Sequence, residues 1–171
     1  MKRKHKTRIL AIDPGTRNIG YAVFENGHLK YFGVKTIPRK SQLIDILKDG
    51  KSIINGLLKD FRPRVLVVER TYFGNNKGSE ILNRFFRAIK LIGRRKGLRV
   101  QSIPVNTVRK SVCGDGWGNK EKVMKTLSGA YPQLRPYSKS NREWKKDFHQ
   151  NMFDAVALGL AQINLDSDSV A

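Results

Sequence analysis

Three acidic side chains lie in apolar segments of this 171-residue chain, where charged residues are rare. Asp13 ends the apolar run 9–12, Glu69 ends the run 65–68, and Asp154 lies within a third apolar segment. Burying a lone carboxylate is costly, whereas a group of carboxylates binds a hard cation such as Mg²⁺. Two such ions about 3.5–4 Å apart activate water and stabilise the leaving oxygen in phosphodiester cleavage. We therefore expect these acids to be catalytic metal ligands; the alternative is that each caps a helix or pairs with a nearby arginine.

The charge of the chain favours a polyanionic partner. Its 34 lysine and arginine residues, against 14 acidic residues, give a formal net charge of +20 and a pI near 10.4. Contacts between such cations and phosphates release condensed counterions, so this excess favours binding to nucleic acid. No apolar run approaches the roughly 20 residues that span a bilayer, and we expect no membrane partner. The single cysteine, Cys113, excludes an internal disulfide and suits a reducing cytoplasm.

Hydrophobic periodicity and turn residues predict strands and helices along the chain. Strands are expected at 7–13, 18–25, 28–37, 64–70 and 98–104, with an Asn-Gly hairpin turn after the second. Helices are expected at 41–60 and 79–96 and at 150–163, with 131–146 as an exposed excursion. Two further helices are expected, a short one capped by Asn106 and one capped by Asn119 that reaches residue 127. This order predicts one α/β domain over residues 1–171, whose mixed central sheet, a three-stranded antiparallel meander plus parallel strands, is flanked by helices. We expect residues 1–6 and 165–171 to be flexible tails.

Four segments of the chain carry a resemblance to a known family. They are AIDPGTRNIGYAV, VVERTYF, NTVRKSVCGDGWGNKEKV and FDAVALGLA. In order and spacing they resemble the RuvC family of Holliday-junction resolvases. The resemblance implies a ribonuclease-H-like fold, a homodimer, Mg²⁺ or Mn²⁺ as cofactor, and paired symmetric nicks across a four-way DNA junction in recombination and repair. It also implies that Asp13, Glu69 and Asp154 are metal ligands, because they fall on acids of the family.

The fourth ligand position departs from the family. Many members carry an Asp or a His three residues before the last acid, and this chain has Asn151 there. An offset of three keeps Asn151 on the helix face of Asp154, although its amide oxygen is a weaker ligand than a carboxylate. His149 is the alternative if the helix starts after it, and Asp147 is a third candidate.

Basic residues near these segments are candidates for DNA contacts. Arg109, Lys110, Lys120 and Lys122 surround the glycine-rich stretch 114–118. We expect them to contact phosphates; the alternative is a solvated basic face. The resemblance implies functional roles for Arg109 and Lys120, and we expect Lys120 to stabilise charge in the transition state.

An aromatic pair follows the second acid. Tyr72 lies three residues after Glu69 and matches an aromatic residue that the family inserts near the junction centre. Stacking on an unpaired base contributes about 1–3 kcal/mol. Packing inside the protein is the alternative for Tyr72, and Phe73 is able to exchange roles with it.

Two other functions compete with junction resolution. The first is a non-catalytic module that binds branched DNA on a decayed nuclease fold; the three intact acids argue against it, and Asn151 argues for it. The second is a related ribonuclease-H-like nuclease that processes ribosomal RNA; the basic stretch 106–123 and the aromatic residue after Glu69 argue against it. For the homodimer, helix 79–96 offers an apolar surface made of Ile81, Leu82, Phe85, Phe86, Ile89 and Ile92.

Overall fold

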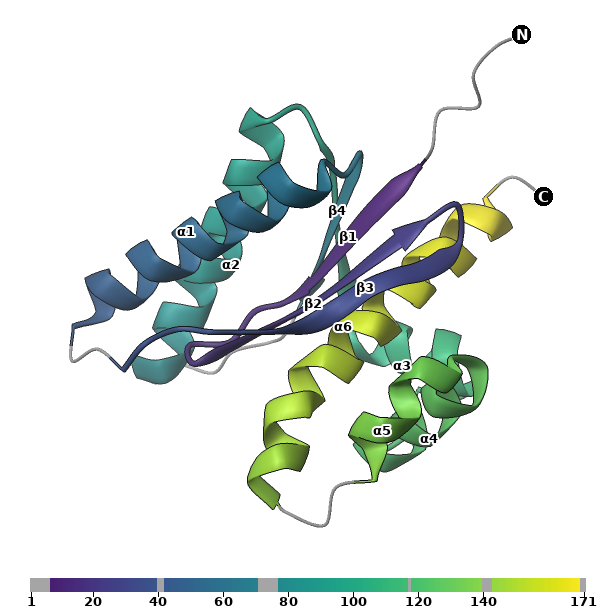
Figure 1. Cartoon of the computed structure of the whole chain (residues 1–171). Helices are drawn as coiled ribbons and strands as arrows, with labels where there is room; N and C mark the ends of the chain where they lie inside the picture. Colours follow the sequence, from purple (N-terminus) through teal and green to yellow (C-terminus); the bar gives the residue numbers. More distant parts are fainter. Residues whose placement is uncertain (1–6, 40–41, 71–76, 117, 140–142, 170–171) are drawn as a thin grey trace, which may run out of the picture.

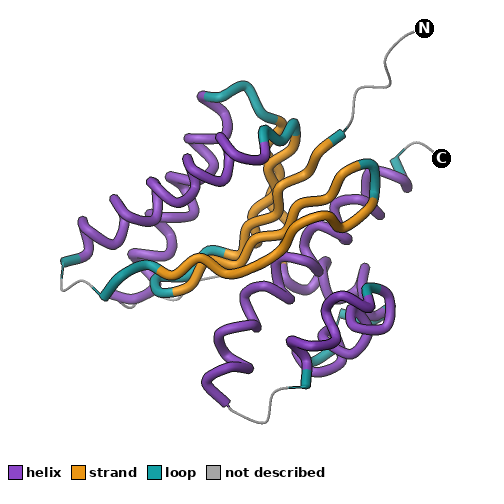
Figure 2. Tube along the Cα trace, viewed as in Figure 1, coloured by secondary structure: helices purple, strands orange, loops and turns teal. Residues whose placement is uncertain are grey.

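A computed structural model describes residues 7–39, 42–70, 77–116, 118–139 and 143–169 of the chain. Its sheet has five strands, which are β1 (Arg8–Asp13), β2 (Asn18–Glu25), β3 (His28–Thr36), β4 (Val65–Arg70) and β5 (Arg99–Pro104). The helices are α1 (Leu43–Phe61), α2 (Lys77–Arg95), α3 (Val105–Cys113), α4 (Lys120–Ala130), the 3₁₀ turn η1 (Pro132–Leu134), α5 (Arg135–Ser138) and α6 (Glu143–Asp168). Figure 2 shows the orange strands running between two groups of purple helices.

The sheet is mixed, as the sequence predicts. Its strand order is β3-β2-β1-β4-β5. β2 pairs antiparallel with both β1 and β3, and β4 pairs parallel with β1 and β5. The hairpin turn between β2 and β3 falls at Asn26 and Gly27, whose φ angles of 52° and 83° are those that an Asn-Gly turn adopts.

Helices cover both faces of this sheet (Figure 1). One face carries α1 and α2, and the other carries α6 together with α3, α4 and α5. Among the described residues, no helix combines the length and the apolar composition that crossing a membrane would require.

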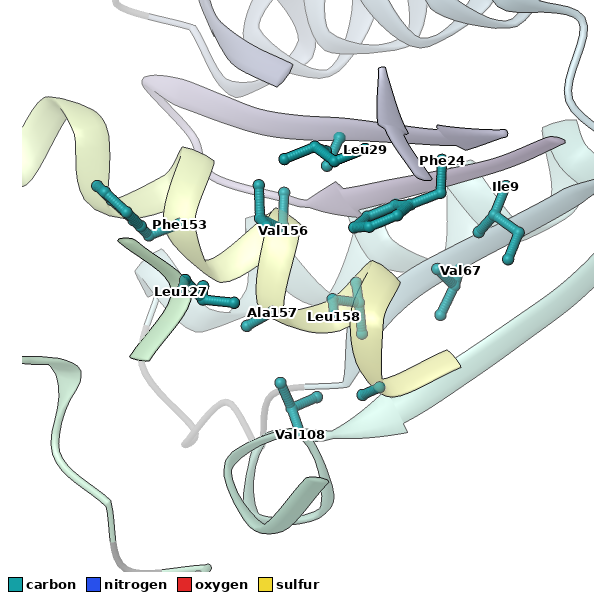
Figure 3. Packing of buried hydrophobic residues seen from close by; sticks show 14 of the residues in the cluster. Ile9, Phe24, Leu29, Val67, Val108, Leu127, Phe153, Val156, Ala157 and Leu158 are labelled. Carbon is teal, nitrogen blue, oxygen red and sulfur yellow. The ribbon is translucent and has the colours of Figure 1, made fainter. Parts of the chain in front are cut away.

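Alternation of side chains along the strands divides the core into two halves. In β1 and β4, Leu10, Ile12, Leu66 and Val68 pack on the α1 and α2 side, whereas Ile9, Ala11, Val65 and Val67 pack on the α6 side. Figure 3 shows the second half, in which Phe24, Val156 and Leu158 lie between the sheet and α6. Asp13 and Glu69 continue the series of odd-numbered positions, so the same alternation directs both carboxylates to the α6 side.

Two glycines let α6 lie close to the sheet. A Cβ atom on Gly20 of β2 would be 1.8 Å from the backbone oxygen of Asn151 in α6. A Cβ atom on Gly159 of α6 would be 2.3 Å from the Phe24 ring. Gly20 is also the direct partner of Asp13 in the β1–β2 register. The closest approach of helix and sheet therefore lies beside the first candidate acid.

Several predicted boundaries differ from those of the structure. α6 begins at Glu143 and ends at Asp168, so it is longer than the expected 150–163 and includes most of the expected tail 165–171. The expected excursion 131–146 contains η1, α5 and the start of α6, and Leu134 is fully buried there. Its two prolines and many charged residues indicated an exposed segment, although Leu134 within it is buried. α3 starts at Val105 after Pro104, so Asn106 does not cap it.

Other predicted features are present. Asn119 caps α4, because its side chain accepts a hydrogen bond of 2.8 Å from the backbone N–H of Lys122. On α2, most of the expected apolar surface is used inside the protein. Phe85 and Ile89 are buried in the core half beneath α1 and α2, Phe86 and Ile92 pack against it partly buried, and Ile81 is buried. The expected tail 1–6 lies outside the described residues.

Substitution of Gly20 by alanine tests the close approach. The new methyl group meets backbone rather than a flexible side chain, so we expect G20A to lower the free energy of unfolding by about 1–3 kcal/mol or more. Gly56→Ala is the matched control, because nothing lies within 4 Å of its Cβ position in α1, and it should raise stability by about 0.5–1 kcal/mol. Urea unfolding measures both. Equal midpoints for G20A and the parent would contradict the close approach.

Candidate active site

Asp13, Glu69 and Asp154 line one cavity of about 510 Å³. Asp13 and Glu69 end the neighbouring parallel strands β1 and β4, whose register pairs Ile12 with Val68 one step earlier. Asp154 comes from α6, which packs over the same face. Parallel strands deliver their carboxyl ends to one edge of a sheet, which explains why residues so distant in sequence meet there.

The three carboxylates are poorly compensated. Asp13 and Glu69 are each 8% exposed, and the two share a side-chain hydrogen bond. Burial, followed by the negative charges of Glu69 and Asp154, raises the pKa of Asp13 well above its usual range. Burial and then the charge of Asp154 raise the pKa of Glu69 to about 7. The cavity therefore disfavours the ionised form of its own acids until a cation enters it.

Two amide side chains contact these acids. Asn151 Nδ2 donates a hydrogen bond of 2.9 Å to Asp13 Oδ2. Gln150 Nε2 donates one of 2.8 Å to Asp154 Oδ1. Both amides line the cavity. Gln150 was not among the predicted site residues. Its position four residues before Asp154 on one helix was the signal that the two side chains meet.

Two of the four expected DNA-binding cations lie at the acids. Arg109 of α3 and Lys120 at the start of α4 line the cavity, and their charges lower the pKa of both Glu69 and Asp154 against the larger effect of burial. Lys110 lines an adjacent hollow with Asn106, Thr107 and Gly116. Lys122 lies outside both, and its ammonium group forms an ion pair with Asp115.

The three candidates for the fourth position have different surroundings. Asn151 and Asp147 line the cavity. His149 does not; its ring lies against Tyr137 and Phe148, at centroid distances of 5.1 and 5.2 Å. Since α6 starts at Glu143, His149 is inside a continuous helix, and the condition under which it would turn toward Asp154 is not met. The expected aromatic contacts Tyr72 and Phe73 lie outside the described residues.

The side chains in the cavity suit a hard divalent ion whose coordination shell is completed by ligands from outside the protein. Among the described ranges, no group of three or more His, Cys, Asp and Glu side chains is arranged to hold a metal ion by itself. Mg²⁺ rarely uses such a protein cage, because it keeps several waters and is held by one or two carboxylates together with substrate phosphates. Acids whose pKa is raised by burial, with Arg109 and Lys120 lining the same cavity, fit that mode of binding.

Comparisons with known proteins identify relatives of this chain. The family model for crossover junction endodeoxyribonuclease RuvC matches residues 9–129, which include Asp13, Glu69, Arg109 and Lys120 but not Asp154. The chain is 29% identical to the RuvC of Akkermansia muciniphila over 161 residues, 91% of this chain and 90% of that protein. It is 30% identical to the RuvC of Rickettsia typhi over 132 residues, 72% of this chain and 82% of that protein.

Solved structures extend the likeness to the fold. Thermus thermophilus RuvC superposes with a TM-score of 0.73 at 18% identity, covering 95% of this chain and 97% of that one. The same protein in complex with a Holliday junction substrate gives a TM-score of 0.74 over 95% and 96% of the two chains. The fold is therefore ribonuclease-H-like, as the resemblance implied. Because the family model covers more than half of the sequence and the fold agrees over nearly all of it, this chain belongs to the RuvC family.

Proposed function

We propose that the protein is a metal-dependent endodeoxyribonuclease that resolves four-way DNA junctions by paired symmetric nicks. The observation that carries the proposal is the meeting of three acids, two of them buried, and two cations in one cavity. The relatives named above are crossover junction endodeoxyribonucleases, and one solved RuvC holds a Holliday junction substrate. We propose the cytoplasm as its compartment, because its substrate is DNA and its one cysteine suits a reducing environment.

Each residue of the cavity has a proposed role. Asp13, Glu69 and Asp154 hold Mg²⁺, which Mn²⁺ is expected to replace, and Asn151 contributes at the fourth position. When bound, the ions supply an activated water and stabilise the leaving oxygen. Arg109 and Lys120 hold the phosphate at the acids, and Lys120 offsets the charge that develops on it. Lys110 and Lys122 contact flanking phosphates, Lys122 after exchanging its pairing with Asp115.

We also propose that the protein acts as a homodimer. A four-way junction presents two equivalent strands, so symmetric cutting needs two related sites. Leu43 and Ile44 of α1 are 51% and 71% exposed. They line a groove of about 850 Å³ between α1 and α2. We propose that a second copy of this chain occupies the groove. An exposed apolar patch on a basic protein marks an interaction site, and the same patch on a second copy would cover it with apolar surface.

Removing the charge of each acid tests the catalytic assignment. Asp13→Asn, Glu69→Gln and Asp154→Asn keep the shape but lose the charge that attracts the ion, so we expect cleavage to fall by about 100-fold or more. Junction affinity should persist, because it depends on the +20 net charge and its phosphate contacts. The measurement compares nicking of labelled four-way DNA, linear duplex and branched RNA, with and without Mg²⁺.

The outcomes of this experiment separate the functions. If the parent binds the junction but does not cut it in Mg²⁺, a non-catalytic binding module replaces the nuclease. If all three variants cut the junction as the parent does, the three acids lose their assignment as metal ligands. If the parent prefers branched RNA, the protein is an RNA-processing nuclease. If one variant alone nicks the junction at the parental rate, the substituted residue is not a metal ligand, and the assignments of the other two acids stand.

The fourth position is tested by adding charge. Asn151→Asp restores a carboxylate beside Asp13, so Mg²⁺-supported cleavage should stay at the parental rate or rise. His149→Ala should be milder than Asn151→Ala, because the His149 ring packs on Tyr137 and Phe148 rather than lining the cavity. Rates are compared on one junction substrate at matched folded fraction. The reverse ranking would assign the ligand to His149.

The raised pKa of Glu69 predicts a pH dependence of stability. In the folded, metal-free protein this carboxyl binds its proton up to about pH 7, whereas the ordinary value is 4.5. The folded state therefore holds the extra proton between these values, so stability falls as pH rises from about 4.5 to 7. Glu69→Gln should lose less stability than the parent between pH 5 and 8 in EDTA, as measured by urea unfolding. Added Mg²⁺ should restore the stability of the parent protein at pH 8. Equal losses in parent and variant would contradict the prediction.

Charge placed in the apolar groove tests the dimer. Ile44→Glu should shift the protein toward monomer in sedimentation velocity at micromolar concentration. Leu165→Glu is the matched control, because Leu165 is 42% exposed on α6 and does not line the groove. A parent that sediments as a monomer, even with the junction bound, would remove the homodimer from the proposal.

A further inference from the structure

Gln150 and Asp154 form a pair one helical turn apart on α6. The Gln150 amide donates a hydrogen bond of 2.8 Å to Asp154 Oδ1, and both side chains line the cavity of the acids. A carboxylate on a helix has several accessible rotamers, and a donor four residues away selects one of them. Of the two oxygens of Asp154, one is thereby occupied by the amide.

The neighbouring residue makes the second amide contact, but to another acid. Asn151 bonds to Asp13, and Gln150 bonds to Asp154. Two adjacent residues of one helix thus reach carboxylates from two different elements. The Gln150 contact is local to α6, so it persists whether or not the helix shifts against the sheet, and it adds no charge to a cavity that already holds three acids.

We propose that Gln150 is a positioning residue of the metal site: its amide holds Asp154 Oδ1 and directs Oδ2 toward the divalent ion. This inference rests on the proposed metal-dependent function and specifies how one of its ligands is prepared. Outer-shell hydrogen bonds of this kind orient a ligand and change metal affinity by about 10–100-fold.

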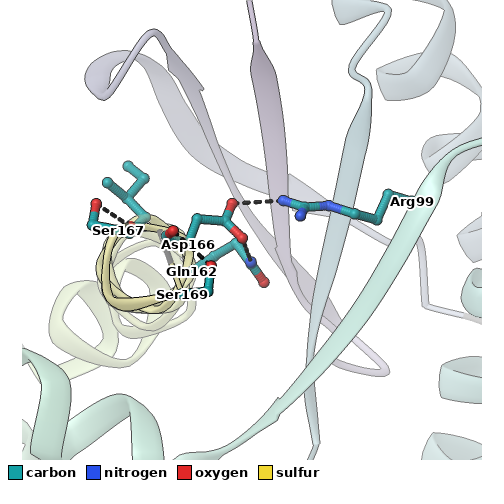
Figure 4. A network of polar contacts seen from close by, with 6 residues as sticks. Arg99, Gln162, Asp166, Ser167 and Ser169 are labelled. Atoms are coloured by element: carbon teal, nitrogen blue, oxygen red, sulfur yellow. Dashed lines mark hydrogen bonds and ion pairs between the residues drawn. The ribbon is translucent and has the colours of Figure 1, made fainter. Parts of the chain in front are cut away.

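The same helix supplies a matched control. Gln162 Nε2 donates a hydrogen bond of 3.0 Å to Asp166 Oδ1, again across four residues. Figure 4 shows this second pair, in which Asp166 also meets Arg99 of β5 at 2.6 Å. Neither Gln162 nor Asp166 lines the cavity. The two pairs share residue types, spacing and helix. They differ in that Gln162 is buried, Asp166 is also paired with Arg99, and both lie outside the cavity of the acids.

The test measures Mn²⁺ binding to the DNA-free protein by isothermal titration calorimetry, together with urea unfolding. Gln150→Met keeps the length of the side chain and removes the donor, and Gln150→Ala repeats the loss with a smaller residue. We expect both to weaken Mn²⁺ binding by about 10-fold. Gln162→Met should leave it within about twofold of the parent, although it removes an equivalent helical hydrogen bond.

Three results overturn the inference. If both Gln150 variants bind Mn²⁺ with the affinity of the parent, the Gln150 amide has no role at the metal site. An equal loss in Gln162→Met assigns the effect to the stability of α6 rather than to positioning. A parent that binds no Mn²⁺ and does not nick the junction overturns the proposed function together with this inference, whereas a parent that does both confines the failure to Gln150.

Discussion

The structure depends on the contact between the backbone of α6 and the backbone of β2 at Gly20. No side chain separates helix from strand there, since even a methyl group on Gly20 would overlap the Asn151 carbonyl. This contact fixes the depth and rotation of α6 over the sheet. Asn151 then reaches Asp13, the strand partner of Gly20, and Asp154 follows one turn later along the same helix. The spacing of the acids is thus set by packing against the sheet, although their negative charges repel one another.

That repulsion between the carboxylates lowers the stability of the folded protein, and the proposed chemistry requires it. Two of the acids are almost fully buried, and burial and neighbouring negative charge raise the pKa of both. A structural ion pair would have placed a cation in contact with each acid; here Arg109 and Lys120 stand across the cavity, and their charges offset only part of the effect of burial. Local instability of this kind is expected where a site is built for a ligand that is not always present.

Much of the fold was predictable because the strands follow simple rules. The continuous apolar runs 9–12 and 65–68 predict strands that are buried on both faces, and the Asn-Gly turn predicts how the meander closes. The register of β1 and β4 in the structure then places Asp13 and Glu69 on one face of the sheet. What the sequence could not supply was the start of α6, because residues 143–149 are mostly polar and follow a segment with two prolines. Without that boundary, His149 stayed open as a ligand. Gln150 was expected at the start of the same helix as Asp154, and its offset of four residues was the signal for their contact.

The hydrogen bond between Asn151 and Asp13 joins residues 138 positions apart. A ribosome makes Asp13 first and Asn151 only 138 residues later, so a nascent chain contains β1 long before it contains a complete cavity. Contacts over so long a separation are slow to form. During synthesis, the emerging polypeptide lacks the helix that completes the group of acids. The order of the elements therefore delays cutting until the whole domain has emerged and folded.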